Sequence, residues 1–272
     1  MIFRLAEIFL PNRIFSIRFQ TMDTEKILQK AFSDNKGALA NPGDLLNVAM
    51  EFQQLLMIYE SAIKVVKTRC EILQDEFEAK HERRPIATIS SRIKEPMSIA
   101  EKLQRKGLAI TLDNMVSKLK DIAGIRITCP FISDVYHVLL MLKNQSDIKI
   151  EDVKDYIKFP KKSGYRSLHV IVCVSVDFSD TQRVVPVEIQ IRTIAMDFWA
   201  SVEHQLHYKK DYNLPANVDD ELRAIADTIA QTDERMQSIA RHIPGFVDYT
   251  SVSEEISALK AYYAHVIETL EI

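Results

Sequence analysis

The sequence predicts an α+β fold in which one mixed β-sheet is flanked by helices. Apolar residues recur every three or four positions early in the chain and again late in it, which is the period of an amphipathic helix. The middle of the chain instead holds short runs in which apolar and polar residues alternate, the pattern of half-buried strands. Strands that are grouped between helices indicate an α+β protein with a single sheet.

Three helices are expected in the first half of the chain. Residues 45–80 carry one long apolar stripe at helical spacing. The segment 92–106 predicts a second helix, because Pro96 suits a first turn and Gly107 suits a stop. A short third helix is expected over residues 111–121.

The middle of the chain predicts four strands with one helix inserted between the first two. The strands are expected at residues 124–129, 148–157, 166–176 and 183–193. Ser133 is the expected N-cap of the inserted helix, which runs to about residue 145. The last two strands predict a hairpin. Further helices are expected at residues 193–210, 216–242 and 252–271.

Composition and charge exclude several classes of protein. The chain is 47% hydrophobic and 27% charged, which is ordinary for a soluble globular protein. Its net charge of −3 gives no overall attraction to DNA, so we expect no DNA partner. No apolar stretch is long enough for a signal peptide or a membrane span. The scattered cysteines Cys70, Cys129 and Cys173 make no disulfide pattern, so we expect a cytoplasmic location, with Cys129 and Cys173 as small core residues.

Polar residues follow one face of the two strongest strands. In VEIQIRT, the residues Glu188, Gln190 and Arg192 alternate with apolar residues and must share a face. The same alternation puts Tyr165 and His169 on one face of the preceding strand. If the two strands pair, His169 and Glu188 lie on the same polar face. The plainer interpretation of VEIQIRT taken alone is a half-exposed sheet.

Asp121 is a second carboxylate of interest, because it stands just before the strand at 124–129. An Asp and a Glu that converge from neighbouring strands suit a cation that prefers oxygen ligands, such as Mg²⁺. The alternative is that Asp121 only ends a helix, which is common for this residue type.

Basic residues are concentrated in the middle of this acidic protein. They are Arg92, Lys94, Lys102, Arg105, Lys106, Arg126, Lys161, Lys162 and Arg166. Ser98 and Lys102 lie one helical turn apart, with Arg105 three residues on. A solvated charged face is the alternative, since Glu95 and Glu101 partly neutralise the stripe. Arginines beside two carboxylates and a tyrosine predict a site for a polyphosphate with a nucleobase to stack. No P-loop or protein-kinase signature is present.

Four segments in order resemble those of the RelA/SpoT-type synthetase domain, in the small, single-domain form of GTP pyrophosphokinase. They are SRIKEPMSIAEKL, KDIAGIRI, KSGYRSLHV and VEIQIRTIAMDFWASVEHQLHYK. The resemblance implies a mixed sheet flanked by helices, related to nucleotidyltransferases. It also implies transfer of the β,γ-pyrophosphate of ATP to the ribose 3′-oxygen of GDP or GTP. The products would be AMP and ppGpp or pppGpp, the alarmones of the stringent response.

The resemblance also implies a role for each matching residue. Adenine would lie between Arg92 and Arg126. The phosphates of ATP would contact Lys94, Ser98, Lys102 and Arg105. Mg²⁺ would be held by Asp121 and Glu188, with Glu188 also placed to accept the 3′-hydroxyl proton. Guanine would stack on Tyr165. The acceptor nucleotide would also contact Lys162, His169, Gln190 and Asp197, the last of which stands where many relatives have Asn.

The same resemblance implies how the chain divides into domains and which activities of the family it has. Residues 1–44 are expected to be an N-terminal extension and a candidate for disorder, 45–240 the synthetase domain, and 241–272 a helical segment that could serve oligomerisation. No His-Asp dipeptide of the hydrolase type occurs, so we expect synthesis without hydrolysis, and ribosome binding is not expected. The resemblance also implies a homotetramer. Two alternatives stay open: a pyrophosphokinase with another acceptor, such as an adenine nucleotide or the 3′ end of tRNA, and an inactive nucleotide- or RNA-binding regulator.

Overall fold

The computed structural model describes residues 42–208 and 217–254. These residues fall into two compact parts. One part contains residues 42–50 and 95–115, and the other contains residues 51–94, 116–208 and 217–254. The predicted N-terminal extension up to residue 41 and most of the predicted helix at 252–271 lie outside the described residues.

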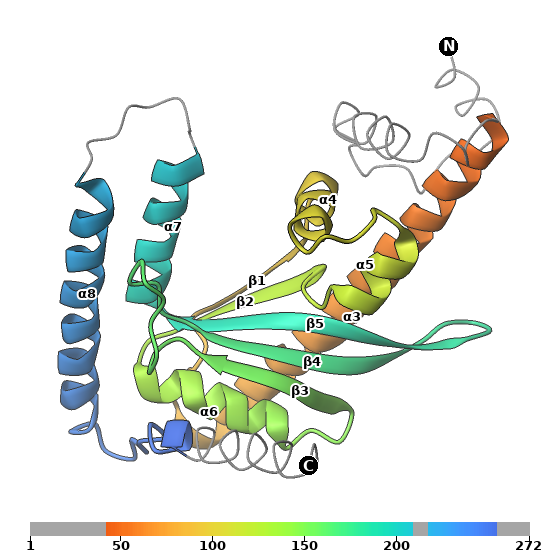
Figure 1. Cartoon of the computed structure of the whole chain (residues 1–272). Helices are drawn as coiled ribbons and strands as arrows, with labels where there is room; N and C mark the ends of the chain where they lie inside the picture. The colour runs from red at the N-terminus through yellow and green to blue at the C-terminus, as the bar shows by residue number, and fades with distance from the viewer. Residues whose placement is uncertain (1–41, 209–216, 255–272) are drawn as a thin grey trace, which may run out of the picture. The chain divides into compact units, whose positions relative to one another are not determined.

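The larger part is built on one five-stranded sheet with the order β1-β2-β5-β4-β3 (Figure 1). The strands are β1 (Thr88–Ile93), β2 (Ala123–Cys129), β3 (Ile148–Asp155), β4 (Leu168–Asp177) and β5 (Gln182–Thr193). Only the central β2–β5 pair is parallel, and the other three pairs are antiparallel. The mixed sheet that the sequence predicts is therefore confirmed, and β4 and β5 form the predicted hairpin.

The apolar face of the sheet is the core of this part. The residues that β2, β4 and β5 send to it are almost completely buried, as the alternation in the sequence predicts. Helix α6 (Ile132–Lys143) packs on this face against β2, β3 and β5. Helix α3 (Pro42–His81) buries Val66 and Cys70 and meets α6 where the Phe77 ring lies edge-on to His137.

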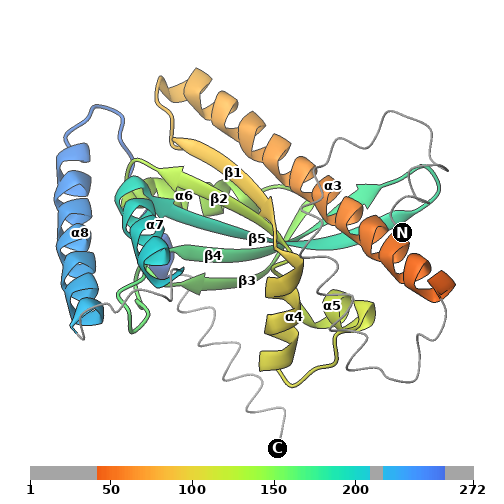
Figure 2. The same ribbon diagram turned by 90° about the horizontal axis from the view of Figure 1, so that it is seen from above.

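Helices α7 (Ile194–Tyr208) and α8 (Val218–Ala240) stand side by side at one end of the sheet (Figure 2). The Thr193 hydroxyl accepts a hydrogen bond from the Met196 amide at the start of α7 and donates one of 2.5 Å to the buried carboxylate of Asp233 on α8. The Trp199 indole N–H donates to the carbonyl of Leu222 at 2.8 Å. These bonds fix α8 to the C-terminal end of β5.

The residues after α8 fold back onto α6. Ser133 accepts from the Tyr249 amide and donates to the Val247 carbonyl, and the Tyr249 ring stacks on His137 with centroids 4.1 Å apart. Ser253 and Tyr136 both donate to the Asp155 carboxylate at the end of β3. The other oxygen of Asp155 accepts from the backbone amides of residues 157 and 158, which begin the loop between β3 and β4.

The smaller part contains helix α4 (Pro96–Arg105) and most of α5 (Leu112–Lys118). Pro96 lies in the first turn of α4 as predicted. Gly107 ends the helix with φ of +69°, a left-handed conformation that glycine adopts most easily. Its amide donates to the Gln104 carbonyl. Helix α4 therefore begins and ends where the proline and glycine signals indicate, once its first predicted residues are reassigned.

Three expectations are corrected by the structure. Residues 92 and 93 belong to strand β1 and not to a helix, because the backbone from Thr88 to Ile93 pairs antiparallel with β2. Ser133 is not an N-cap, since Phe131 caps α6 and Ser133 lies inside it. Cys173 is not a core residue: it is half-buried on the polar face of β4 beside Glu151, whereas Cys129 is buried as expected.

Candidate active site

Strand register brings the predicted polar residues to one face of the sheet. Glu188 on β5 pairs with Gly124 on β2 and with Ile171 on β4. Two residues along, Gln190 pairs with Arg126 on β2 and with His169 on β4. Paired residues point to the same face, so Arg126, Gln190 and His169 form a row across three strands with Glu188 in the adjacent row.

A closed ring of hydrogen bonds joins five of these side chains. Arg192 donates to the Tyr165 hydroxyl at 3.4 Å and to the Gln190 amide oxygen at 2.6 Å. The Tyr165 hydroxyl lies 2.8 Å from Nε2 of His169, and Nδ1 of His169 lies 3.3 Å from the Glu188 carboxylate. The Gln190 amide donates to the other Glu188 oxygen at 2.8 Å. Both branches thus start at the Arg192 guanidinium, which can only donate, and end at a carboxylate, which can only accept.

The surroundings of Glu188 favour its anionic form. Burial alone raises the pKa of this carboxyl group, but the hydrogen bond and charge of His169 and the hydrogen bond of Gln190 outweigh burial, so the pKa of Glu188 lies below its ordinary value. The charge of Asp121 acts in the opposite direction and raises the pKa of Glu188. The two carboxylates are therefore close enough to interact.

Asp121 lies at the start of β2 with its side chain mostly buried. Lys94 extends over it from the end of β1, with Nζ 2.6 Å from a carboxylate oxygen. The Lys94 amide also donates to the Ile122 carbonyl at 2.8 Å, so the backbone holds the two residues together. Within the residues that the structure describes, no cluster of three or more His, Cys, Asp or Glu side chains forms a metal site. Two carboxylates nevertheless suit Mg²⁺, which commonly takes one or two protein carboxylates and completes its shell with water and phosphate.

Arg92 and Arg126 are diagonal neighbours on adjacent strands. Arg92 pairs with Gly124, and Arg126 lies two residues further along β2, so both side chains rise from the same face of the sheet. Diagonal neighbours stand about 7–8 Å apart, which is close to the separation of two planar groups that stack on either side of a nucleobase. One carboxylate oxygen of Asp197 on α7 lies 3.6 Å from a guanidinium nitrogen of Arg126 and 3.4 Å from one of Arg192.

The Tyr165 ring is held on several sides. Its edge meets Tyr156, with centroids 6.2 Å apart, and its hydroxyl belongs to the ring of hydrogen bonds. The ammonium of Lys161 lies 4.6 Å from the Tyr165 ring centroid and 4.7 Å from that of Tyr156. Burial lowers the pKa of Lys161, and the charge of Glu188 partly restores it. Lys161 is therefore directed toward the aromatic side of the site.

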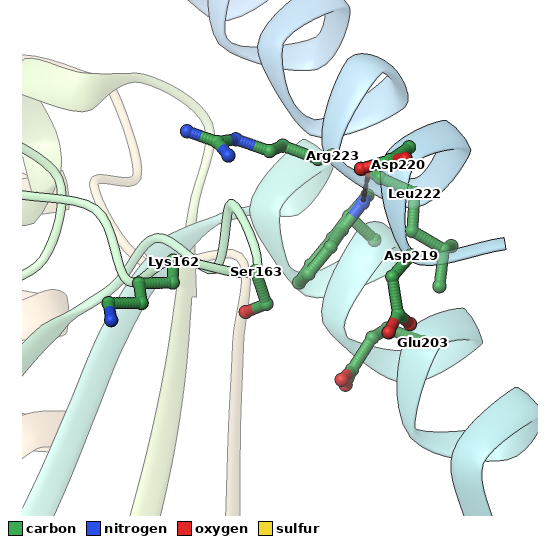
Figure 3. A pocket seen from close by; sticks show the side chains of 8 residues that line it. Lys162, Ser163, Glu203, Asp219, Asp220, Leu222 and Arg223 are labelled. Carbon is green, nitrogen blue, oxygen red and sulfur yellow. Dashed lines mark hydrogen bonds between the residues drawn. The ribbon is translucent and has the colours of Figure 1, made fainter. Parts of the chain in front are cut away.

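The adjacent Lys162 lies elsewhere. It lines a cleft of about 420 Å³ between the loop, α7 and α8. Figure 3 shows Lys162 and Ser163 projecting from the loop on one side of this cleft, with Glu203 and Asp219 on the other. The two lysines of the KKSGYR segment thus lie in different places, Lys161 beside the tyrosine rings and Lys162 in the cleft.

Comparison with known proteins identifies the family. Residues 91–213 match the model described as "Region found in RelA / SpoT proteins". The chain is 42% identical over 200 residues to GTP pyrophosphokinase YwaC of Bacillus subtilis, covering 74% of this chain and 95% of that protein. It is 35% identical to GTP pyrophosphokinase YjbM of the same organism, over 70% of this chain and 88% of the relative.

The chain belongs to the RelA/SpoT family.

A solved structure of a family member agrees with this assignment. The structure of small alarmone synthetase 1 from Bacillus subtilis, bound to its product pppGpp, matches with a TM-score of 0.66 and 35% identity. The match covers 71% of this chain and 98% of that one. The RelA/SpoT resemblance and the fold expected from it are therefore confirmed.

The site residues that the RelA/SpoT resemblance assigns fall in both parts of the chain. The larger part brings together Arg92, Lys94, Asp121, Arg126, Tyr165, His169, Glu188, Gln190 and Asp197. The smaller part carries Ser98, Lys102 and Arg105 on α4. These three residues are spaced by four and three positions, so they share a stripe on the helix, while Ile99 and Leu103 are buried.

The family resemblance assigns no role to Arg192, Lys161 or Tyr156, although Lys161 belongs to the predicted basic patch. Arg192 is only 2% exposed although the chemistry of arginine favours solvent, and this burial is visible only in the structure. The prediction that Arg166 belongs to the basic patch of the site is wrong, because its guanidinium binds α8. KKSGYR offers two adjacent lysines, and the structure places Lys161 over the tyrosine rings and Lys162 in the cleft.

Proposed function

We propose that this protein is a GTP pyrophosphokinase that transfers the β,γ-pyrophosphate of ATP to the 3′-oxygen of GDP or GTP and releases AMP. The observation that carries the proposal is the set of side chains that converges on Glu188 from two strands, in a chain 42% identical to a named GTP pyrophosphokinase. The small alarmone synthetase of similar fold holds pppGpp, the product of such a transfer.

The acceptor nucleotide is assigned to the Tyr165 side of the site. The aromatic ring offers a flat face for guanine, and such base stacking is worth about 1–3 kcal/mol. Lys161 lies over this ring, and His169 and Gln190 belong to the same ring of hydrogen bonds, so three polar side chains lie near a base that stacks there. Lys162 and Asp197 are further candidates for acceptor contacts. Because the hydrogen bonds fix Tyr165 and His169 in place, the acceptor would be oriented with little rearrangement of the protein.

ATP is assigned to the β1 and β2 side of the same face. The diagonal pair Arg92 and Arg126 suits an adenine ring held between two guanidinium planes. Lys94 would contact the phosphates, and the family resemblance gives the same role to Ser98, Lys102 and Arg105 of α4. The Lys94 ammonium lies 2.6 Å from the Asp121 carboxylate in this structure. When ATP binds, the ammonium would exchange this partner for a phosphate oxygen.

Asp121 and Glu188 would hold the Mg²⁺ that phosphoryl transfer requires. When bound, the ion neutralises charge on the transferred phosphates and polarises phosphorus for attack. The protein supplies positioning: the arginines and lysines hold the phosphate chain, and the acceptor residues direct the 3′-oxygen toward it. Glu188 can accept the 3′-hydroxyl proton, although its lowered pKa makes it a weak base and a good anionic ligand.

Assembly and location belong to the same proposal. We propose a cytoplasmic homotetramer without membrane or DNA partners. Among the helices of the described ranges, none is long and apolar enough to cross a membrane. The broad apolar stripes that the sequence predicts for residues 45–80 and 216–271 are the reason to expect association of subunits.

The test is transfer of label from [γ-³²P]ATP to each of four acceptors: GDP, GTP, ADP and tRNA. We expect labelled ppGpp and pppGpp, with AMP as the second product, and no labelled product formed from ADP or tRNA. Glu188→Gln serves as the inactive control. Transfer to ADP or tRNA without transfer to GDP or GTP would overturn the assignment of the acceptor, and absence of transfer to any acceptor would overturn the enzymatic proposal.

A further inference from the structure

The Arg166 side chain faces helix α8 and not the polar face of the sheet. One guanidinium nitrogen donates to the Gly164 carbonyl at 3.0 Å and to the Ala226 carbonyl at 3.3 Å. Another donates to the Asp227 carboxylate at 3.0 Å. The side chain is only 16% exposed, whereas that of Asp227 is 57% exposed. Arg166 thus joins the loop that precedes β4 to the backbone of α8.

Gly164 brings the loop into direct contact with the same turn of α8. It is buried with φ of +91°, a conformation that residues with a side chain rarely adopt. A Cβ atom built on Gly164 would lie 2.6 Å from the Ala226 Cβ, closer than two carbon atoms can approach. Backbone conformation and close packing therefore both require glycine at this position.

The residue between these two contacts is Tyr165. Its ring packs against a small core formed by Trp199 and Ala200 of α7 and Leu222 and Ala226 of α8. The hydroxyl at the other end of the ring meets His169 in the site. Tyr165 is consequently set between α8 and the catalytic face, with an α8 contact on each side of it in the sequence.

We propose that α8 is the template that positions the acceptor loop, and that Arg166 is the positioning residue that fixes Tyr165 for the incoming guanine base. This inference deepens the proposed function and rests on it for the substrate. The Arg166–Asp227 ion pair contributes little, because Asp227 is exposed. The bonds to the two carbonyls carry the effect. Both come from one guanidinium nitrogen whose N–H directions are fixed by the planar group, whereas the ammonium of a lysine ends a flexible stem and holds no fixed direction.

Preorganisation is the physical reason. Residues 156–167 connect two strands without regular structure, so ordering this loop at the moment of binding would reduce affinity for the acceptor. A loop already fixed on α8 avoids that loss. The effect is confined to the acceptor, because Arg92 and Arg126, which are assigned to ATP, lie on other strands.

The test compares Arg166→Ala, Arg166→Lys and Asp227→Asn with Arg235→Ala, a change at an exposed position further along α8. For Arg166→Ala we expect the KM for GDP and GTP to rise about tenfold, which corresponds to 1.4 kcal/mol. The KM for ATP and kcat at saturating acceptor should change less than about twofold. Arg166→Lys should resemble Arg166→Ala, and the other two variants should resemble the wild type.

Three results would overturn the inference: an equal rise of both KM values, a fall of kcat with unchanged KM, or full recovery in Arg166→Lys. Hydrogen–deuterium exchange of residues 156–167 separates this inference from the proposed function. Faster exchange in Arg166→Ala, with unchanged exchange in the sheet, supports the template role even if the acceptor proves to be another nucleotide. Unchanged exchange in the loop overturns it whatever the acceptor is. If Arg166→Ala fails to fold, Arg166→Met takes its place with the same expected results, because it keeps the length of the side chain but has no group that donates to the two carbonyls.

Discussion

Arg192 contacts Tyr165 in two ways: it donates a hydrogen bond to the hydroxyl, and its guanidinium carbon lies 5.6 Å from the centre of the ring. Burial lowers the pKa of Arg192, and nearby Tyr165 and Asp197 partly offset that loss. A buried cation therefore supports the residue proposed to stack the acceptor base.

We predict that Arg192→Lys lowers kcat/KM for GDP and GTP by at least about tenfold. A lysine has one nitrogen and cannot reach Gln190, Tyr165 and Asp197 together, and a hydrogen bond to a charged group is worth about 1.5–3 kcal/mol. Steady-state kinetics with each nucleotide varied in turn measures the effect. Arg183→Lys, at an exposed position on the same strand, is the control. Wild-type kinetics in Arg192→Lys would show that the ring of hydrogen bonds does not contribute to acceptor use.

We predict that Glu188→Gln lowers kcat by about 10²–10⁴-fold, the usual contribution of a carboxylate base. Gln keeps the size of the side chain and can still accept from His169, so the fold should be retained. Asp121→Asn should instead raise the Mg²⁺ concentration that gives half-maximal activity. Nucleotide chromatography over a Mg²⁺ titration measures both. A Glu188→Gln enzyme as active as the wild type is incompatible with the assigned role.

We predict that Lys161→Ala weakens acceptor binding more than Lys162→Ala does. The Lys161 ammonium lies on the faces of Tyr156 and Tyr165, whereas Lys162 lines the cleft beside α7 and α8. Isothermal titration of GDP into the two variants, which carry the same change in net charge, gives the comparison directly. Equal losses in the two variants would mean that only the number of positive charges matters.

We predict that acid destabilises the fold through His137. Burial, with the charges of Arg83 and His81, lowers the pKa of this imidazole from 6.5 to about 4. A group with a lowered basic pKa is neutral in the folded state but protonated in the unfolded state between these values. The free energy of unfolding should therefore fall as the pH drops from 6.5 to 4, by on the order of 2 kcal/mol after allowance for solvent screening.

Urea unfolding between pH 7.5 and pH 4 measures this dependence. His137→Phe keeps a ring that can stack on Tyr249 but removes the titrating group, so its stability should depend less on pH in this window. Identical pH dependence in the two proteins would assign the acid sensitivity to other groups.

Much of the fold could be predicted because strands β4 and β5 alternate between apolar and polar residues. In β5, Val187, Ile189 and Ile191 are fully buried and the residues between them reach the site, as period-two alternation requires. Strand β1 could not be predicted in this way. It lies at the edge of the sheet with mostly exposed residues, and its pairing with β2 depends on contacts distant in sequence.

The candidate site could be predicted as a set of residues but not as a network. Alternation indicated that His169 and Glu188 share a face, and the structure confirms it with Nδ1 and the carboxylate 3.3 Å apart. The direction of a long side chain is not encoded in local spacing, which is why Arg166 was grouped with the site cations and Arg192 received no role. Tertiary contacts with α7 and α8 decide both.

The parallel pairing of β2 with β5 has a consequence for preparations of the enzyme. A slip of one residue in this pairing would turn Glu188, Gln190 and Arg192 into the helix-covered core and expose their apolar neighbours. Chains with a displaced register would therefore unfold, because they would bury polar side chains, and would not remain as compact inactive protein. Specific activity in a purified sample should consequently track the fraction of native protein.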